Sequence, residues 1–134
     1  MKYMLDTNIL IYFIKHKPLS VAQRINALGD EANLCMSFFT YAELLKGAER
    51  SSKKSVVLRQ LDALTGLIPV LFDAGRSLCE HYAHQFLALK ARGTPVGAND
   101  LWIACHALSH QATLVSRNVR EFKRIEGLQL EDWV

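Results

Sequence analysis

Short apolar runs alternate along this chain with segments in which apolar residues recur at helical spacing. The runs have the length of buried strands, and the segments between them are long enough for helices. Strands and helices that alternate in this way form parallel sheets covered by helices on both faces. The sequence therefore predicts one three-layer α/β/α domain over residues 1–134, with a central, mostly parallel sheet of about four to five strands. The expected strands lie near residues 3–5, 34–36, 68–71, 112–115 and 128–130, the last of them at an edge.

Three acidic side chains stand where expected strands end or expected helices begin: Asp6, Glu43 and Asp100. The carboxyl ends of parallel strands line one crevice, so we expect these carboxylates to lie close together. Such a cluster is costly without a counter-ion. Carboxylate oxygens without histidine or cysteine partners suit Mg²⁺, or Mn²⁺, which can activate a water molecule for phosphodiester hydrolysis. The pattern favours a metal-dependent nuclease.

Each of these acids also has an explanation that involves no chemistry. Asp6 can cap the helix that follows it, and on local sequence alone a cap is about twice as frequent as a site. Thr40 and Glu43 fit a capping box, with Thr40 as the N-cap. Asn99 can cap the next acid-bearing helix, in which the helix dipole favours Asp100. The same arrangement, an acid between a strand and a helix, recurs along the chain, and this recurrence favours a functional site over separate caps.

A further polar group follows the expected strand 112–115. Asn118 or Glu121 in this stretch is a candidate fourth member of the acidic site. The stretch is also the most basic part of the chain, and its cations can meet RNA phosphates beside the scissile bond. An ordinary solvated helix face explains the same charges equally well. The cations are Arg117, Arg120, Lys123 and Arg124.

Charge and composition narrow the class of protein. Lys and Arg number 16 against 13 Asp and Glu, a net charge of +3 that permits nucleic acid as a partner without requiring it. The apolar run after Asn8 is too short for a membrane span or a signal peptide, so we expect a cytoplasmic protein. Cys35, Cys79 and Cys105 form no CxxC pair, which argues against zinc knuckles and disulfides.

The histidines suggest no catalytic role. His81 and His84 stand one turn apart in the expected helix 74–91, but no acid or cysteine at helical spacing faces them. Asp73 is expected to cap that helix. His106 lies in the strongly apolar helix 101–108 and fits a core or interface position.

Four stretches of the chain resemble the motifs of the PIN domain, and within it those of the VapC toxins of bacterial toxin–antitoxin pairs. The resemblance extends to the closing residues 130–133 and covers essentially the whole chain. One such motif would be weak, but four in order at these spacings are specific. The motifs are residues 4–8, 37–48, 95–104 and 114–122.

This resemblance implies an Mg²⁺-dependent endoribonuclease. Thr7 would orient Asp6 or a metal-bound water by hydrogen bonding. The chain departs from many PIN domains at position 118, which is Asn118 where they carry Asp, so either this residue or Glu121 completes the site. The implied acidic core is Asp6, Glu43 and Asp100.

The resemblance also implies partners. One is a cognate VapB-type antitoxin, which we expect to insert a cation into the acidic crevice. Another is structured RNA, with a tRNA anticodon loop as the leading candidate, because single-stranded loops are where a protein can recognise sequence. We further expect a homodimer and a larger toxin–antitoxin complex, since the helix faces at 21–28 and 57–64 have surplus apolar surface.

Two alternatives belong to other classes of function. A catalytically silent PIN-fold module would bind RNA or protein without cleavage, but degenerate copies usually lose acids and this chain retains three. A DNA-processing nuclease of the same fold is disfavoured by the small size of the chain. Metal-dependent cleavage of RNA and DNA oligonucleotides would separate these possibilities.

Overall fold

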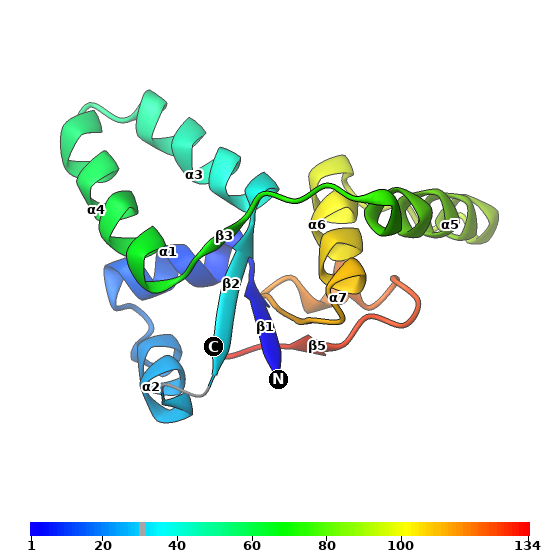
Figure 1. Cartoon of the computed structure of the whole chain (residues 1–134), viewed down its shortest axis with the longest axis horizontal. Helices are drawn as coiled ribbons and strands as arrows, with labels where there is room; N and C mark the ends of the chain where they lie inside the picture. Colours follow the sequence, from blue (N-terminus) through cyan, green and yellow to red (C-terminus); the bar gives the residue numbers. More distant parts are fainter. Residues whose placement is uncertain (30–31) are drawn as a thin grey trace.

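A five-stranded sheet forms the centre of the molecule, between two layers of helices (Figure 1). The strands are β1 (Lys2–Leu5), β2 (Asn33–Ser37), β3 (Val70–Leu71), β4 (Thr113–Val115) and β5 (Leu130–Glu131). This computed structural model describes residues 1–29 and 32–134. All neighbouring strands pair in parallel, in the order β3-β2-β1-β4-β5. The predicted three-layer α/β/α architecture is confirmed, with β5 at an edge.

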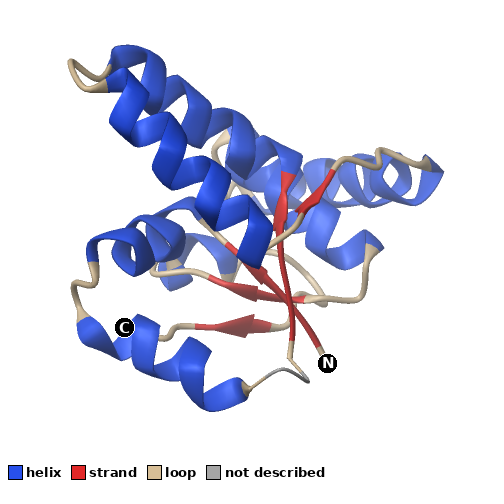
Figure 2. Cartoon of the chain, turned by 60° about the vertical axis from the view of Figure 1, so that its left-hand side comes forward, coloured by secondary structure: helices blue, strands red, loops and turns tan. Residues whose placement is uncertain are grey.

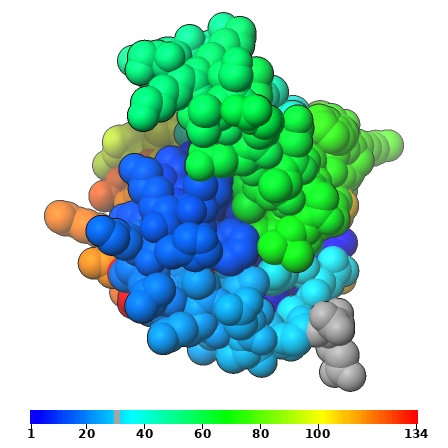
Figure 3. All heavy atoms as spheres, turned by 90° about the vertical axis from the view of Figure 1, so that its left-hand side faces the viewer, coloured from blue at the N-terminus to red at the C-terminus, as the bar shows by residue number. Residues whose placement is uncertain are grey.

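The helices divide between the two faces of the sheet (Figure 2). On one face lie α1–α4, and Figure 3 shows α1, α2 and α4 together on this side of the molecule. On the other face lie α5, α6 and α7. In the described part of the chain, no helix combines the length and apolar character needed to cross a bilayer. The helices are α1 (Thr7–Lys15), α2 (Leu19–Leu28), α3 (Phe38–Arg50), α4 (Lys54–Leu67), α5 (Arg76–Arg92), α6 (Ala98–Ser109) and α7 (Val119–Phe122).

Burial on both faces explains why the strands are continuously apolar. In β1, Leu5 packs into the core formed with α1–α4, whereas its neighbour Met4 packs into the core formed with α5 and α6. The same alternation places Met36 in the first core and Cys35 in the second. Successive strand residues point to opposite faces of a sheet, so a strand covered on both sides needs apolar residues at every position.

The order of the strands determines where a ligand can bind. From β1 the chain proceeds to β2 and β3 on one side, then returns to β4 and β5 on the other. Leu5 pairs with Val115, so the residues that follow β1 and β4 emerge next to each other. In open parallel sheets, such a reversal of strand order leaves a crevice at the carboxyl ends of the strands.

The helix that carries Glu43 begins earlier than predicted. Strand β2 passes directly into α3 without a loop, and Ser37 is the N-cap, its Oγ accepting a hydrogen bond from the Phe39 amide at 3.2 Å. The predicted capping box is therefore wrong, because Thr40 lies inside the helix. Its hydroxyl is buried and has no hydrogen-bond partner among the described residues.

Two other predicted caps are also wrong. Helix α5 begins at Arg76 with Gly75 as its N-cap, because the carboxylate of Asp73 is bound to histidines of α6 instead. Helix α6 begins at Ala98 with Gly97 as its N-cap, so Asn99 lies within the first turn.

The apolar helix faces that motivated a homodimer belong to the core of the chain itself. Their central residues are buried, and the remaining two pack against the same core cluster. The reason given for a dimer is therefore wrong, although dimerisation itself stays a prediction. The buried residues are Val21, Ile25, Leu61 and Leu64, and the partly buried ones are Leu28 and Val57.

We expect Ser37→Ala to lower the free energy of unfolding by about 1–2 kcal/mol, because it removes the cap of α3. It also removes a hydrogen bond between Ser37 Oγ and His106 Nδ1. Thr40→Val is expected to leave stability unchanged or to raise it, since the hydroxyl that it removes has no partner in the described chain. Urea denaturation of both variants tests this, and a larger loss for Thr40→Val than for Ser37→Ala would show that Thr40 is the cap.

Candidate active site

Asp6 lies where β1 passes into α1, and its carboxylate both caps the helix and faces the other acids. Its Oδ1 accepts a hydrogen bond from the Thr7 amide at 2.8 Å, and its Oδ2 accepts one from Ser116 Oγ at 2.7 Å. The residue is only 5% exposed. Burial raises the pKa of Asp6, these hydrogen bonds lower it in part, and the charge of Glu121 raises it again. The capping interpretation and the site interpretation therefore both apply to this residue.

Glu43 extends from α3 towards the same crevice. Burial raises the pKa of its half-buried carboxyl, and the nearby charge of Asp6 raises it further. Glu43 Oε1 and Thr7 Oγ1 are fully buried and form no hydrogen bond of standard geometry among the described residues, although the Thr7 hydroxyl lies near enough to lower the pKa of Glu43 in part. Buried polar atoms of this kind are rare and call for a ligand or water. These two oxygens are available to a ligand between α1 and α3.

Asp100, in the first turn of α6, is paired with Glu121 from α7. Burial and the charges of Asp6 and Glu121 raise the pKa of Asp100 to about 7. Burial also acts on Glu121, but hydrogen bonds of 2.7 Å from the Gly97 amide to Oε1 and from Asn118 Nδ2 to Oε2 hold its pKa below the ordinary value. Near neutral pH, Glu121 is therefore ionised, while Asp100 carries a proton part of the time.

Asn118 and Glu121 are linked to each other, and only Glu121 has a carboxylate to add to the site. Asn118 Nδ2 donates to Glu121, and its backbone amide donates to Ser116 Oγ at 2.9 Å. Ser116 Oγ in turn donates to Asp6. Ser116 was not predicted as a separate site residue, although a hydroxyl residue directly after a strand, two positions before Asn, is a typical turn-forming signal.

The four basic residues in and directly after the fourth motif are not equivalent. Arg117 Nη1 lies 3.1 Å from Asp132 Oδ2, and Arg124 Nη1 donates to the carbonyl oxygen of Pro95 at 2.6 Å. Arg120 and Lys123 are exposed, and their side chains form no hydrogen bond or ion pair within the part of the chain that the structure describes. Two of the predicted RNA-binding residues therefore have intramolecular partners, and two have side chains open to solvent.

The donor set of this crevice fits a hard divalent cation. The available ligands are carboxylate oxygens, together with the hydroxyl of Thr7, and such oxygens are preferred by Mg²⁺ and Mn²⁺. Burial and mutual repulsion disfavour the ionised carboxylates of the crevice and raise their pKa values. A cation bound among these carboxylates would favour their ionised forms. The carboxylates are those of Asp6, Glu43, Asp100 and Glu121.

Comparisons with known proteins find relatives along the whole chain. The family model described as PIN domain matches residues 3–128. A protein named Ribonuclease VapC1, from Haemophilus influenzae strain R2866, is 48% identical over 133 residues, which cover 99% of this chain and 98% of the relative. A protein named tRNA(fMet)-specific endonuclease VapC, from Shigella flexneri, is 40% identical over 133 residues, with the same coverage of 99% and 98%.

The fold is similar to that of solved structures as well. VapBC-1 from nontypeable Haemophilus influenzae, determined at 2.2 Å resolution, contains a chain that superposes with a TM-score of 0.91 at 48% identity. The match covers 99% of this chain and 98% of that one.

The raised pKa of Asp100 has a consequence for stability that Asp100→Asn tests. Above its ordinary value of 3.8 the unfolded chain has released this proton while the folded metal-free protein still holds it, so stability falls as the pH rises from about 4 to about 7. The Asp100→Asn variant should not lose stability in this way, because its amide does not titrate. We expect its melting temperature to exceed that of the wild type by more at about pH 8 than at about pH 5.

The matched control for this comparison is Asp62→Asn, which changes an exposed acid on α4. The difference in melting temperature between Asp62→Asn and the wild type should be the same at both pH values. A gain for Asp100→Asn that does not grow with pH would show that this carboxyl titrates normally.

Proposed function

Since this chain belongs to the PIN domain family, and within it to the VapC ribonucleases, we propose that it is the toxin of a type II toxin–antitoxin pair. Its reaction is the hydrolysis of a phosphodiester bond in RNA. The proposed substrate is a structured RNA, with a tRNA anticodon loop in first place, because the Shigella flexneri relative is named a tRNA(fMet)-specific endonuclease. The proposed place of action is the cytoplasm, where such RNA is found.

The observation that carries this proposal is the convergence of carboxylates at the junction of β1 and β4, where Glu43 Oε1 and the hydroxyl of Thr7 are buried without a hydrogen bond of standard geometry among the described residues. Asp6, Glu43 and Asp100 would hold the cation, which we propose to be Mg²⁺, with Mn²⁺ as a substitute. When bound, the cation activates a water molecule and stabilises the charge on the leaving oxygen.

The remaining side chains of the crevice position these acids. Glu121 is the proposed fourth acid, because its carboxylate lies beside that of Asp100. Asn118 is a positioning residue, since its amide group holds Glu121 Oε2. Thr7 is proposed to orient water or a phosphate oxygen through its unpartnered hydroxyl.

An antitoxin of the VapB type is the proposed partner. The similar Haemophilus influenzae chain was solved as VapBC-1, which supports an assembly of this kind. We propose that the antitoxin inserts an arginine or lysine among the acids, where a cation relieves the repulsion that raises their pKa values. The homodimer and the larger toxin–antitoxin complex remain part of this proposal.

The alternative, a silent binding module, is disfavoured by the energetic cost of the crevice. A binding module has no need of several buried carboxylates in one place, and each raised pKa represents stability that is lost near neutral pH. A chain without metal chemistry would gain stability by losing these acids.

Replacement of the acids tests the proposed reaction. Asp6→Asn, Glu43→Gln and Asp100→Asn are each expected to lower Mg²⁺-dependent cleavage of tRNA on the order of 100-fold or more, because each removes a charge that holds the cation. The measurement is the single-turnover rate on tRNA, with a DNA oligonucleotide in parallel. Asp62→Asn should cleave at the wild-type rate, and a fully active Asp100→Asn variant would overturn the assignment.

Arg120 and Lys123 should contribute to RNA binding, because their side chains are exposed beside the crevice without intramolecular partners in the described residues. Replacing both with alanine is expected to weaken RNA binding. The plot of the logarithm of the binding constant against the logarithm of the salt concentration should become less steep by about 1–2. The charge-matched control is Lys15→Ala with Lys17→Ala, at the far end of α1. An unchanged salt dependence in the Arg120/Lys123 variant would indicate an ordinary solvated face.

A further inference from the structure

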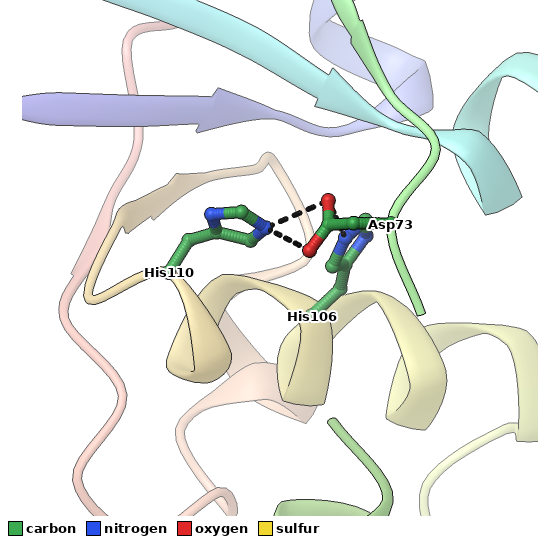
Figure 4. Close-up of side chains that lie close together, drawn as sticks. All are labelled: Asp73, His106 and His110. Atoms are coloured by element: carbon green, nitrogen blue, oxygen red, sulfur yellow. Dashed lines mark hydrogen bonds and ion pairs between the residues drawn. The ribbon is translucent and has the colours of Figure 1, made fainter. Parts of the chain in front are cut away.

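Helix α6 has a second group of polar side chains, well separated along the helix from Asp100. His106, in the last turn of α6, and His110, the C-cap residue of that helix, point towards Asp73, which lies between β3 and α5 (Figure 4). His106 Nε2 lies 3.4 Å from Asp73 Oδ1, and His110 Nε2 lies 2.8 Å from Asp73 Oδ2. One ligand atom of each residue lies within 4.8 Å of the other two.

These distances are suitable for three ligands of one metal ion. A tetrahedral zinc ion with bonds of about 2.0–2.2 Å separates its ligand atoms by about 3.3–3.6 Å. A single oxygen of Asp73, Oδ1, lies 3.4 Å from His106 Nε2 and 3.0 Å from His110 Nε2, so these two separations are within about 0.3 Å of this range. The two histidines are four residues apart, the spacing at which two side chains share one face of a helix. Small side-chain adjustments would therefore bring all three ligands around one ion.

The most buried ligand is already oriented as metal-binding histidines are. His106 is fully buried, and its Nδ1 lies 2.7 Å from Ser37 Oγ, so Nε2 is held towards Asp73. A hydrogen bond at the non-coordinating nitrogen commonly fixes such a ring in metal sites. Burial also lowers the pKa of His106, which favours the neutral ring that binds metals.

We propose that Asp73, His106 and His110 bind one divalent transition-metal ion, with Zn²⁺ as the best match. Two imidazoles and one carboxylate suit Zn²⁺, Co²⁺ or Ni²⁺, whereas Mg²⁺ prefers oxygen ligands. The site therefore differs in chemistry from the acidic crevice. It also differs in position, because His106 follows Asp100 by six residues, or about 9 Å along the helix axis.

The ion would join two parts of the fold. Asp73 belongs to the exposed segment that connects β3 with α5, while His106 lies in the last turn of α6 and His110 is the C-cap residue of that helix. Lys2 opposes binding, because its Nζ lies 3.4 Å from His110 Nδ1 and adds positive charge beside the ion. Removing that charge by Lys2→Met should tighten metal binding.

The test uses metal-free full-length protein titrated with ZnCl₂, followed by calorimetry and thermal melting. We expect one equivalent of Zn²⁺ to bind at this site, and the melting temperature to rise by about 5–10 °C at a free concentration 100 times the dissociation constant. Co²⁺ in place of Zn²⁺ should give visible absorption bands of an ion with nitrogen ligands.

Matched variants distinguish this site from the acidic crevice. His110→Gln and Asp73→Asn change half-buried or exposed side chains and should fold normally, but lose the Zn²⁺-dependent rise. His84→Gln removes an exposed histidine of α5 and should keep the Zn²⁺-dependent rise in melting temperature. Asp6→Asn, which removes one carboxylate from the acidic crevice, should keep it as well. A Zn²⁺ response that survives in His110→Gln, or that disappears in Asp6→Asn, would overturn the proposal.

Discussion

The junction between β1 and β4 is the constraint on which the rest of the molecule depends. The Asp6 amide donates to the carbonyl oxygen of Val115 at 2.9 Å, and the Asp6 carboxylate accepts from Ser116. Parallel pairing of these strands thus joins residues 110 positions apart at the point where the strand order reverses. The other acids reach this point on helices that pack against the sheet, Glu43 on α3 and Asp100 on α6.

The crevice concentrates charge at the expense of stability. Burial and repulsion raise the pKa values of three of its acids, whereas Glu121 keeps its charge because Gly97 and Asn118 donate to it. The two apolar cores on either side of the sheet hold the backbone that carries these groups. A rigid scaffold therefore keeps carboxylates together that would otherwise separate, and a bound cation would relieve the repulsion between them.

Predictions from the sequence were most accurate where the signal was local. The strands were found because runs buried on both faces are continuously apolar. The predicted caps failed at Thr40, Asp73 and Asn99, because the choice of cap depends on where the preceding strand ends and on what else the side chain can bind. The argument for a dimer surface was wrong for a related reason. Periodicity shows that a helix face is buried, but not whether the same chain or a partner covers it.

The sequence by itself determined the fold class, because the apolar runs and helical spacings that mark strands and helices are encoded within a few neighbouring positions. It also predicted that Asp6, Glu43 and Asp100 lie together. Besides burial, the charges of Asp6 and Glu43 do lie close enough to raise the pKa of Asp100, while the role of the three acids in a metal site stays a prediction. Only the tertiary structure decided that Asn118 supports Glu121, that Arg117 is paired with Asp132, and that Asp73 contacts two histidines at the C-terminal end of α6. Those contacts depend on how helices and loops pack across the sheet. The spacing of residues along the chain does not encode such distances, because each contact is made by elements whose relative placement is set by the whole core.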